Sequence, residues 1–387
     1  MDEPIALITD TFFRKPVWLA CVLMALYCAA PTFLHAQTQS TQPTDRPQSS
    51  AGSLPFEEAA AGWLRPFDGI TTYGWHFTKG RPWRVTTDAA LVSPPDAGAT
   101  AVCMPCFPDY ELQMEYQLGP GAAVDVLAGI MPGNLDPSDK TSYAVRLSNS
   151  NGVETPWKRL TLRCVPGGMA VFSLDSELKV VNAIRASSGS FGFKNLHGAF
   201  AVRRLRLRPV ITVRPGLEDA RAKLTADPLG WHGFEAVLGG IRIIAPGGSL
   251  RTGLKARGAL IQADVTIQSG QGSLDLQTGA LARSISLDNR IKGIDHTRPV
   301  AIGTGGIKGL QNAREVIPID GQPFVLTASL GPDGSLGVFI NGYMVSYAPA
   351  GNIQTAGILT LALTVDAPKS VIEIKNLRAA LIAAPAR

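Results

Sequence analysis

The stretch YELQMEYQL, residues 110–118, alternates apolar and polar side chains at every step. Its five apolar side chains, from Tyr110 to Leu118, fall on one face of an extended chain. The acids and amides between them fall on the other face. A period of two with one wet face is typical of a half-buried antiparallel strand. The stretch therefore predicts a β-sheet with one packed side and one polar side.

The same alternation recurs along the chain after residue 55. LIQADVTIQ (260–268) repeats it in the second half, and the Pro-Asp-Gly turn in LGPDGSLG (330–337) joins two apolar stretches as a hairpin would. Helical periodicity is scarce, and EDARAKL (218–224) is the one short helix candidate. Short strands with turns about every ten residues indicate an all-β fold of sandwiches or barrels.

The first 36 residues have the pattern of a secretory signal. Arg14 and Lys15 precede the apolar run 16–34, and the small residue Ala36 follows it. We expect export to the periplasm, the cell surface or the medium, with cleavage after Ala36. An uncleaved anchor is the alternative, because the run approaches the ~20 residues that span a bilayer. The polar stretch 37–54 has almost nothing to bury, and we expect a disordered tether there.

The remaining length exceeds one ordinary core, which splits above roughly 250–300 residues. The apolar pattern breaks near 210–230. We therefore expect two tandem jelly-roll β-sandwiches, at 55–209 and 228–383, with a linker at 210–227.

Charge and cysteine content restrict the partners. The formal net charge of +5 is spread along the chain, so no nucleic-acid partner is expected, and the membrane is met only through the export signal. Of the three cysteines after that signal, Cys103, Cys106 and Cys164, one pair can form a disulfide in an oxidising compartment. Their spacing supports no metal site, and no motif for a cofactor is present.

Two motifs bracket the first half of the chain. It opens with FDGITTYGW (67–75) and WRVTTDAALV (83–92), and it closes with FGFKNLHGAFAVRRLRLRP (191–209). Together they resemble the 3-keto-disaccharide hydrolase family, a secreted concanavalin A-like jelly-roll domain. Ala89 stands where the family has a turn glycine, and Arg204 stands where it usually has asparagine.

The second half resembles another part of the same family pattern. It carries the segment Thr304–Ile307, the pair Asn341-Gly342 and the closing stretch IKNLRAAL (374–381). The resemblance therefore covers both halves and implies two divergent tandem copies.

The resemblance implies cleavage of glycosides that are oxidised at C3. A ketone at C3 makes the C2 proton acidic, so a positioned base can remove it while the C1 substituent leaves, and water then adds. His197 is the catalytic candidate by its His-Gly motif, or else a histidine that bonds locally. Ala144 and Arg146 stand where the family has Glu and Gln on a strand of the concave sheet, which makes Arg146 a substrate-binding candidate.

Further candidates come from the strand pattern. Glu111 and Glu115 share one polar face, either as a catalytic acidic row or as a solvated surface. Trp75 and Trp83 either stack on sugar rings or pack in the core. Arg204 forms a basic ladder with Arg206 and Arg208, at every second position. The ladder either binds anionic glycans or keeps an exposed face soluble.

Two functions follow from these residues. The first is a carbohydrate-active enzyme that cleaves 3-keto-glycosides. The second is a glycan-binding or surface-interaction protein that kept the sandwich fold without the chemistry. In both cases the expected partner is a carbohydrate.

Overall fold

The computed structural model describes sixteen stretches of the chain: 54–78, 82–130, 143–165, 169–174, 177–182, 188–211, 234–238, 240–243, 249–252, 258–269, 271–278, 281–288, 302–303, 322–349, 359–364 and 371–382. Several sequence expectations lie outside them, namely the export signal, tether residues 37–53, the helix candidate at 218–224, most of the linker and the Thr304–Ile307 segment. Residues 49–387 belong to one compact unit. Within the described stretches, no helix has the length and apolar content needed to cross a membrane.

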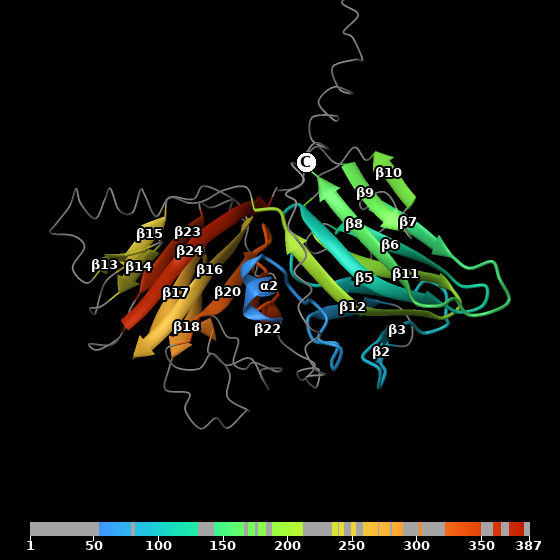
Figure 1. Cartoon of the computed structure of the whole chain (residues 1–387), viewed down its shortest axis with the longest axis horizontal. Helices are drawn as coiled ribbons and strands as arrows, with labels where there is room; N and C mark the ends of the chain where they lie inside the picture. The colour runs from blue at the N-terminus through green and yellow to red at the C-terminus, as the bar shows by residue number, and fades with distance from the viewer. Residues whose placement is uncertain are drawn as a thin grey trace, which may run out of the picture. The chain divides into compact units, whose positions relative to one another are not determined.

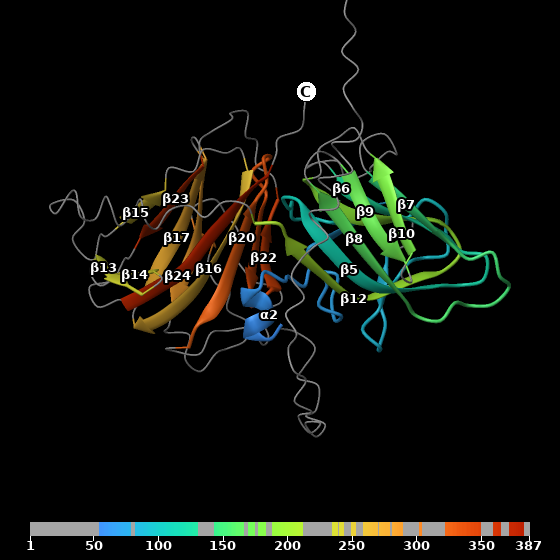
Figure 2. The ribbon, with the colours of Figure 1, turned by 45° about the horizontal axis from the view of Figure 1, so that its top comes forward.

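The first sandwich consists of two antiparallel sheets (Figures 1 and 2). The five-stranded sheet has the order β1 (Trp75–Thr78), β4 (Thr100–Cys103), β11 (Ser190–His197), β6 (Ala123–Ile130), β7 (Tyr143–Ser148). The seven-stranded sheet has the order β10 (Glu177–Asn182), β9 (Met169–Leu174), β8 (Lys158–Val165), β5 (Tyr110–Leu118), β12 (Phe200–Pro209), β3 (Leu91–Val92), β2 (Arg84–Val85).

The second half of the chain forms another pair of antiparallel sheets. The seven-stranded sheet has the order β13 (Phe234–Val237), β14 (Gly240–Ile243), β24 (Val371–Ile382), β16 (Gly258–Ser269), β20 (Phe324–Leu330), β21 (Leu336–Ile340), β22 (Tyr343–Ala348). The five-stranded sheet has the order β15 (Ser249–Thr252), β23 (Leu359–Thr364), β17 (Gln271–Thr278), β18 (Leu281–Asp288), β19 (Ile302–Gly303).

The two halves share one topology. Read in chain order, the strands from β2 to β12 match those from β13 to β24, if β19 is left out. The match reproduces the order of the seven-stranded sheets throughout, so that β5 corresponds to β16 and β12 to β24. In the five-stranded sheets, β4-β11-β6-β7 corresponds to β15-β23-β17-β18. The fold class expected from the sequence, all-β with two tandem jelly-roll sandwiches, is confirmed.

The core of the first sandwich lies between its two sheets. Leu112, Met114 and Tyr116 of β5 point inward, as their alternation predicts, and meet Phe191 and Phe193 of β11. The Tyr110 hydroxyl crosses the core and donates a hydrogen bond to the Ser190 carbonyl oxygen at 3.3 Å. The apolar faces of both sheets are thus closed against one another, which leaves the opposite faces for other roles.

The segment before the first sandwich packs on the second one. It contains the short helix α2 (Phe56–Ala60), which lies beside β20 in Figure 1. Leu54 and Ala59 are buried against Val325 of β20. The expectation that the tether runs to residue 54 is therefore wrong at its last residue, because Leu54 finds an apolar partner that is distant in sequence.

The three cysteines are free thiols in the interior. Burial raises the pKa of Cys103 and Cys106, and raises that of Cys164 to about 12. No disulfide joins them, and each thiol stays protonated at neutral pH. The carbonyl oxygen of Cys106 accepts a hydrogen bond from the Ser329 hydroxyl on β20, so this stretch is part of the contact with the second sandwich.

Candidate functional site

The outer face of the five-stranded sheet in the first sandwich carries a row of polar side chains. Strand register places Thr100 of β4 opposite Lys194 of β11, Lys194 opposite Asp125 of β6, and Asp125 opposite Arg146 of β7. Side chains opposite each other on neighbouring strands lie about 5 Å apart at Cβ and share a face. The residues on either side along these strands, Phe193 and Val126 among them, point into the core. We call these four residues the polar row.

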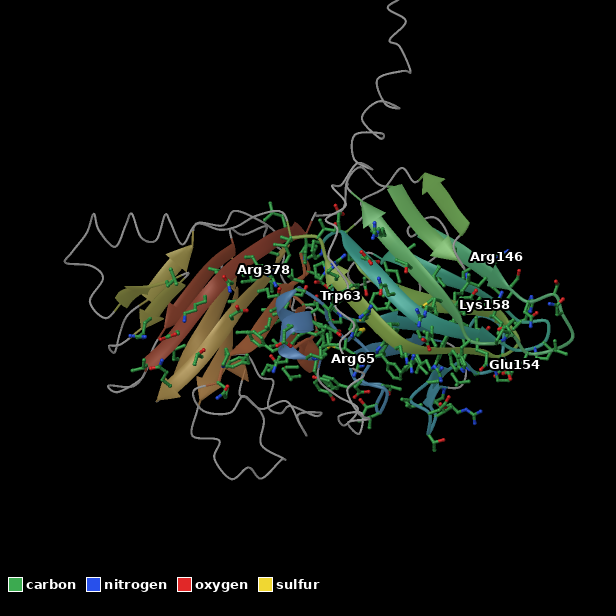
Figure 3. All side chains as sticks on the ribbon, in the orientation of Figure 1. Trp63, Arg65, Arg146, Glu154, Lys158 and Arg378 are labelled. Carbon is green, nitrogen blue, oxygen red and sulfur yellow. The ribbon has the colours of Figure 1, made fainter. Side chains whose placement is uncertain are left out.

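Asp125 and Arg146 form the strongest contact in the polar row. Arg146 donates from Nε to Oδ1 at 2.8 Å and from its terminal nitrogen to Oδ2 at 3.0 Å. A guanidinium group that bonds both carboxylate oxygens holds their plane and position. The carboxylate side chain is only 4% exposed, whereas that of Arg146 is 64% exposed and labelled in Figure 3. The pair thus presents cationic N–H donors to solvent above a fixed acceptor.

Thr100 brings a buried hydroxyl to the same row. The residue is 1% exposed, and its Oγ1 has no hydrogen-bond partner among the described residues. A buried hydroxyl without a partner costs free energy, about 1–3 kcal/mol, which a bound polar group would recover. Beside the row, Val102, Leu127 and Ile130 form a small buried apolar cluster. Arg146 is thus the mostly exposed member of the row, while Thr100, Asp125 and the apolar cluster lie beneath the surface.

Glu111 and Glu115 lie elsewhere, on the outer face of the seven-stranded sheet. Arg163 and Arg208 approach Oε2 of Glu111 at 3.2 and 2.9 Å. Arg203 and Arg204 approach Glu115 at 3.0 and 2.9 Å. Each acid is thereby held by guanidinium groups from the neighbouring strands.

These contacts decide the charge state of both acids. Burial alone would raise the pKa of each one. Hydrogen bonds from Arg208 and Gln113 outweigh burial at Glu111, and those from Arg203 and Arg204 do so at Glu115, so both pKa values lie below the ordinary value. A carboxylate with a lowered pKa is a weak base. The geometry makes these acids structural ion-pair partners, contrary to the catalytic role considered from the sequence.

Trp75 and Trp83 belong to the core. They are 8% and 3% exposed. Trp75 stacks on Phe193 at 5.9 Å between ring centroids and donates from Nε1 to the Pro66 carbonyl oxygen. Trp83 also stacks on Phe193, at 6.0 Å. A sugar ring cannot reach rings that are already covered, so the substrate-binding role expected of them is replaced by packing.

His197 and Arg204 complete the set of sequence candidates. His197 is the exposed last residue of β11, on the five-stranded sheet, so the core separates it from Glu111 and Glu115 on the other sheet. Arg204 lies at a bulge of β12 and binds Glu115. The structure therefore brings Arg204 together with Glu115 but leaves His197 and Arg146 on the other sheet of the sandwich.

The sequence reasoning missed three members of the polar row, namely Thr100, Asp125 and Lys194. The pattern did hold a signal for one of them, because Asp125 interrupts the apolar stretch AVDVLAGI, where only every second residue should face the core. That the three share one face follows from register between strands far apart in sequence, which alternation within one strand does not give. Among the described residues, no group of His, Cys, Asp and Glu is arranged to hold a metal ion.

No family model matches the chain, and no curated protein matches it. Among solved structures, it is similar to a proposed glycosyl hydrolase of Parabacteroides distasonis, with 12% identity and a TM-score of 0.35 over 41% of this chain and 99% of that one. A second proposed glycosyl hydrolase of that organism has 12% identity and a TM-score of 0.32, over 38% of this chain and 90% of that one. The carbohydrate recognition domain of Emp46p has 13% identity and a TM-score of 0.29, over 43% of this chain and 93% of that one. At such low identity and TM-score, these similarities carry no argument about activity.

Proposed function

We propose that this protein is an exported carbohydrate-binding protein, and that the polar row on the five-stranded sheet binds an oxidised sugar. The supporting observation is the Asp125–Arg146 pair with Lys194 beside it, next to the Thr100 hydroxyl, which has no partner within the described stretches. Guanidinium and ammonium groups bind a carbonyl or carboxylate oxygen, which a plain sugar lacks. The Asp125 carboxylate, only 4% exposed, holds the exposed Arg146 guanidinium group in position for that contact.

Binding is the better supported role, because the acids that the sequence offered as bases are neutralised by arginines. The resemblance to 3-keto-disaccharide hydrolases adds the class of sugar, a glycoside with a ketone at C3. The chemistry of the polar row thus suggests an oxidised sugar, and the sequence motifs suggest which oxidised sugar it is.

One observation favours cleavage as a second function. Asp125 lies between two cationic residues, Lys194 and Arg146, in strand register. Removal of a C2 proton next to a ketone needs a carboxylate base and a nearby cation to hold the enolate oxygen. Because Arg146 bonds both oxygens of Asp125, this role requires the guanidinium group to move off the carboxylate first; Asp125 then takes the proton, the C1 substituent leaves, and water adds to the double bond.

Calorimetry with a 3-keto-disaccharide, and with the parent disaccharide that is not oxidised, tests the proposal. We expect the keto sugar to bind more tightly. Arg146→Gln and Lys194→Gln should each weaken that binding about tenfold or more, as expected for a lost hydrogen bond to a charged donor. Arg163→Gln, on the other sheet, is the matched control. Equal binding of both sugars, or equal losses in the control, would remove the proposal.

Release of free 3-keto sugar from the same samples separates binding from cleavage. Cleavage requires release that Asp125→Asn abolishes. His197→Ala tests the histidine of the family motif in the same assay, and a loss there alone would move the catalytic site to the end of β11. Binding without release by the unaltered protein leaves the protein as a glycan-binding module.

A further inference from the structure

The outer face of the seven-stranded sheet in the first sandwich is lined by arginines. Their positions alternate with core residues such as Leu162 on β8 and Leu207 on β12, so the guanidinium groups all point away from the core. Three of the side chains are more than half exposed: Arg159 at 84%, Arg163 at 60% and Arg204 at 62%. We call the following six residues the basic face: Arg159, Arg163, Arg203, Arg204, Arg206 and Arg208.

The basic face holds more positive than negative charge. Its six guanidinium groups are paired with three carboxylates among the described residues, those of Glu58, Glu111 and Glu115. Glu111 and Glu115 are buried beneath the guanidinium groups. The acids therefore position the arginines from below, while solvent meets mainly the cationic edges above. An exposed sheet needs charge to stay soluble, but a one-sided excess is not required for that.

The second sandwich shows that the fold does not require arginines at these registers. Register equates Thr161 of β8 with Thr327 of β20, since both lie opposite a glutamine of the central strand. By the same register Arg159 corresponds to Val325, and Arg163 to Ser329. In the second sandwich these positions are buried, partly under Leu54 and Ala59. The two β8 positions are thus neutral in the second sandwich, where they are covered, whereas the positions of Arg203 and Arg206 on β12 stay basic there, as Lys375 and Arg378.

Indole rings fix the orientation of several arginines. The guanidinium carbon of Arg203 lies 4.0 Å from the ring centroid of Trp157. Those of Arg206 and Arg208 lie 4.4 and 4.8 Å from the ring centroid of Trp63. A stacked guanidinium group keeps the N–H donors of its edge available for carboxylate or sulfate oxygens. Because the guanidinium groups occupy these ring faces, the rings offer little surface on which nucleic-acid bases could stack.

We propose that the basic face binds a linear polyanionic glycan such as a polyuronate. The arginines form two lines, along β8 and β12; outward side chains on one strand recur about every 7 Å, so Arg159 and Arg163, with Thr161 between them, lie about 13 Å apart. A polymer with regularly spaced carboxylates can meet several of these guanidinium groups at once, which a single small anion cannot. This site lies on the other sheet from the polar row and does not depend on the function proposed there.

Binding to polygalacturonate tests the proposal, with neutral dextran, single-stranded DNA and anionic phospholipid vesicles as further probes. The test variant combines Arg159→Ser with Arg163→Ser. The control combines Arg251→Ser with Arg283→Ser, which removes the same charge from strands β15 and β18 of the second sandwich. We expect about tenfold weaker polygalacturonate binding in the test variant only, and weaker binding by every protein at high salt.

Arg204→Asn is a second test variant, in case the double substitution lowers stability. It removes one exposed charge and puts at this position the residue that the second sandwich has at the equivalent one, Asn376. Polygalacturonate binding that is equal to dextran binding would overturn the proposal. So would equal losses in the test and control variants, or binding to DNA or vesicles without binding to polygalacturonate.

Discussion

Arg204 and Asn376 occupy the same position in the two sandwiches and have the same unusual backbone conformation. Each lies at an irregularity of the strand that pairs with the central strand, between Arg203 and Arg206 in one case and between Lys375 and Arg378 in the other. Their φ angles are +50° and +51°. Asparagine tolerates this left-handed region, whereas a long side chain is strained there. The asparagine at this position of the second sandwich is thus explained by the bulge.

Arg204→Asn should therefore leave the free energy of unfolding unchanged or raise it by up to about 1 kcal/mol. The relieved strain offsets the loss of the ion pair with Glu115, because the Arg204 side chain is 62% exposed and Arg203 still holds that carboxylate. The reciprocal change Asn376→Arg should lower the free energy of unfolding by about 1 kcal/mol or more, since Asn376 also donates a hydrogen bond to Asp264 Oδ2 at 2.6 Å. Urea unfolding of both variants measures these differences. A loss above 1 kcal/mol in Arg204→Asn would contradict the strain argument.

Trp75→Ala should lower the free energy of unfolding by about 3–5 kcal/mol, because the ring is buried against Phe191 and Phe193. Trp75→Phe should cost less, since most of the ring volume remains. Thermal or urea unfolding measures both. Where the Trp75→Phe variant is fully folded, its affinity for sugar should change little. If binding fell while stability stayed the same, the indole would be a sugar platform after all.

Stability should fall on acidification because Glu111 and Glu115 have lowered pKa values in the folded state. Such groups stabilise the fold above the unfolded pKa, about 4.3 for Glu, and this contribution disappears as the pH falls through the folded value. We expect the unfolding midpoint in urea to drop progressively below about pH 4. The double variant Glu111→Gln with Glu115→Gln should be less stable at pH 7 and should lose less on acidification. An unchanged acid slope in that variant would assign the effect to other groups.

The three buried thiols should resist modification in the folded protein. Burial raises their pKa values, so thiolate is scarce at neutral pH, and the side chains are also shielded. A thiol reagent should label none of the three in buffer at pH 7 and all three in denaturant, as counted by intact mass. Fast labelling of a single cysteine in buffer would show that one of them is reachable.

The mature protein should begin at Gln37, because the sequence pattern places cleavage after Ala36. N-terminal sequencing of protein recovered from outside the cytoplasm measures this. A full-length N-terminus that remains with the membrane fraction would support the anchor instead.

Alternation predicted the strands and the core faces well, because both depend on neighbours along one strand. LIQADVTIQ and YELQMEYQL became the central strands of the two seven-stranded sheets. The candidate site could not be predicted in the same way. Lys194 and Asp125 are 69 positions apart in the sequence and meet through register between β11 and β6. For Trp75 and Trp83 the sequence left two roles open, since an aromatic motif does not reveal whether its rings face a ligand or the core, and the structure has them in the core.

The family motif also predicted more about the backbone than about chemistry. Ala89, which stands in place of the turn glycine, has a φ of +60°. Gly69 has a φ of +78°, and a side chain there would come within 2.8 Å of the Cβ atom of Ala89. Together with the bulge at Arg204, these positions show that several motif residues are conformational requirements. Their presence indicates the fold, and their replacement says little about catalysis.

The covered face of the second sandwich has a consequence for any attempt to divide the protein. Residues 54–60 and the stretch around Cys106 shield Val325 and Ser329, which carry no charge of their own. If the chain were severed after residue 211, the C-terminal fragment would lose this shield and expose the apolar side chain of Val325, with Ser329 and Arg378 on the same sheet, to other fragments. It should precipitate when expressed by itself, while the N-terminal fragment, with its arginines intact, should stay in solution.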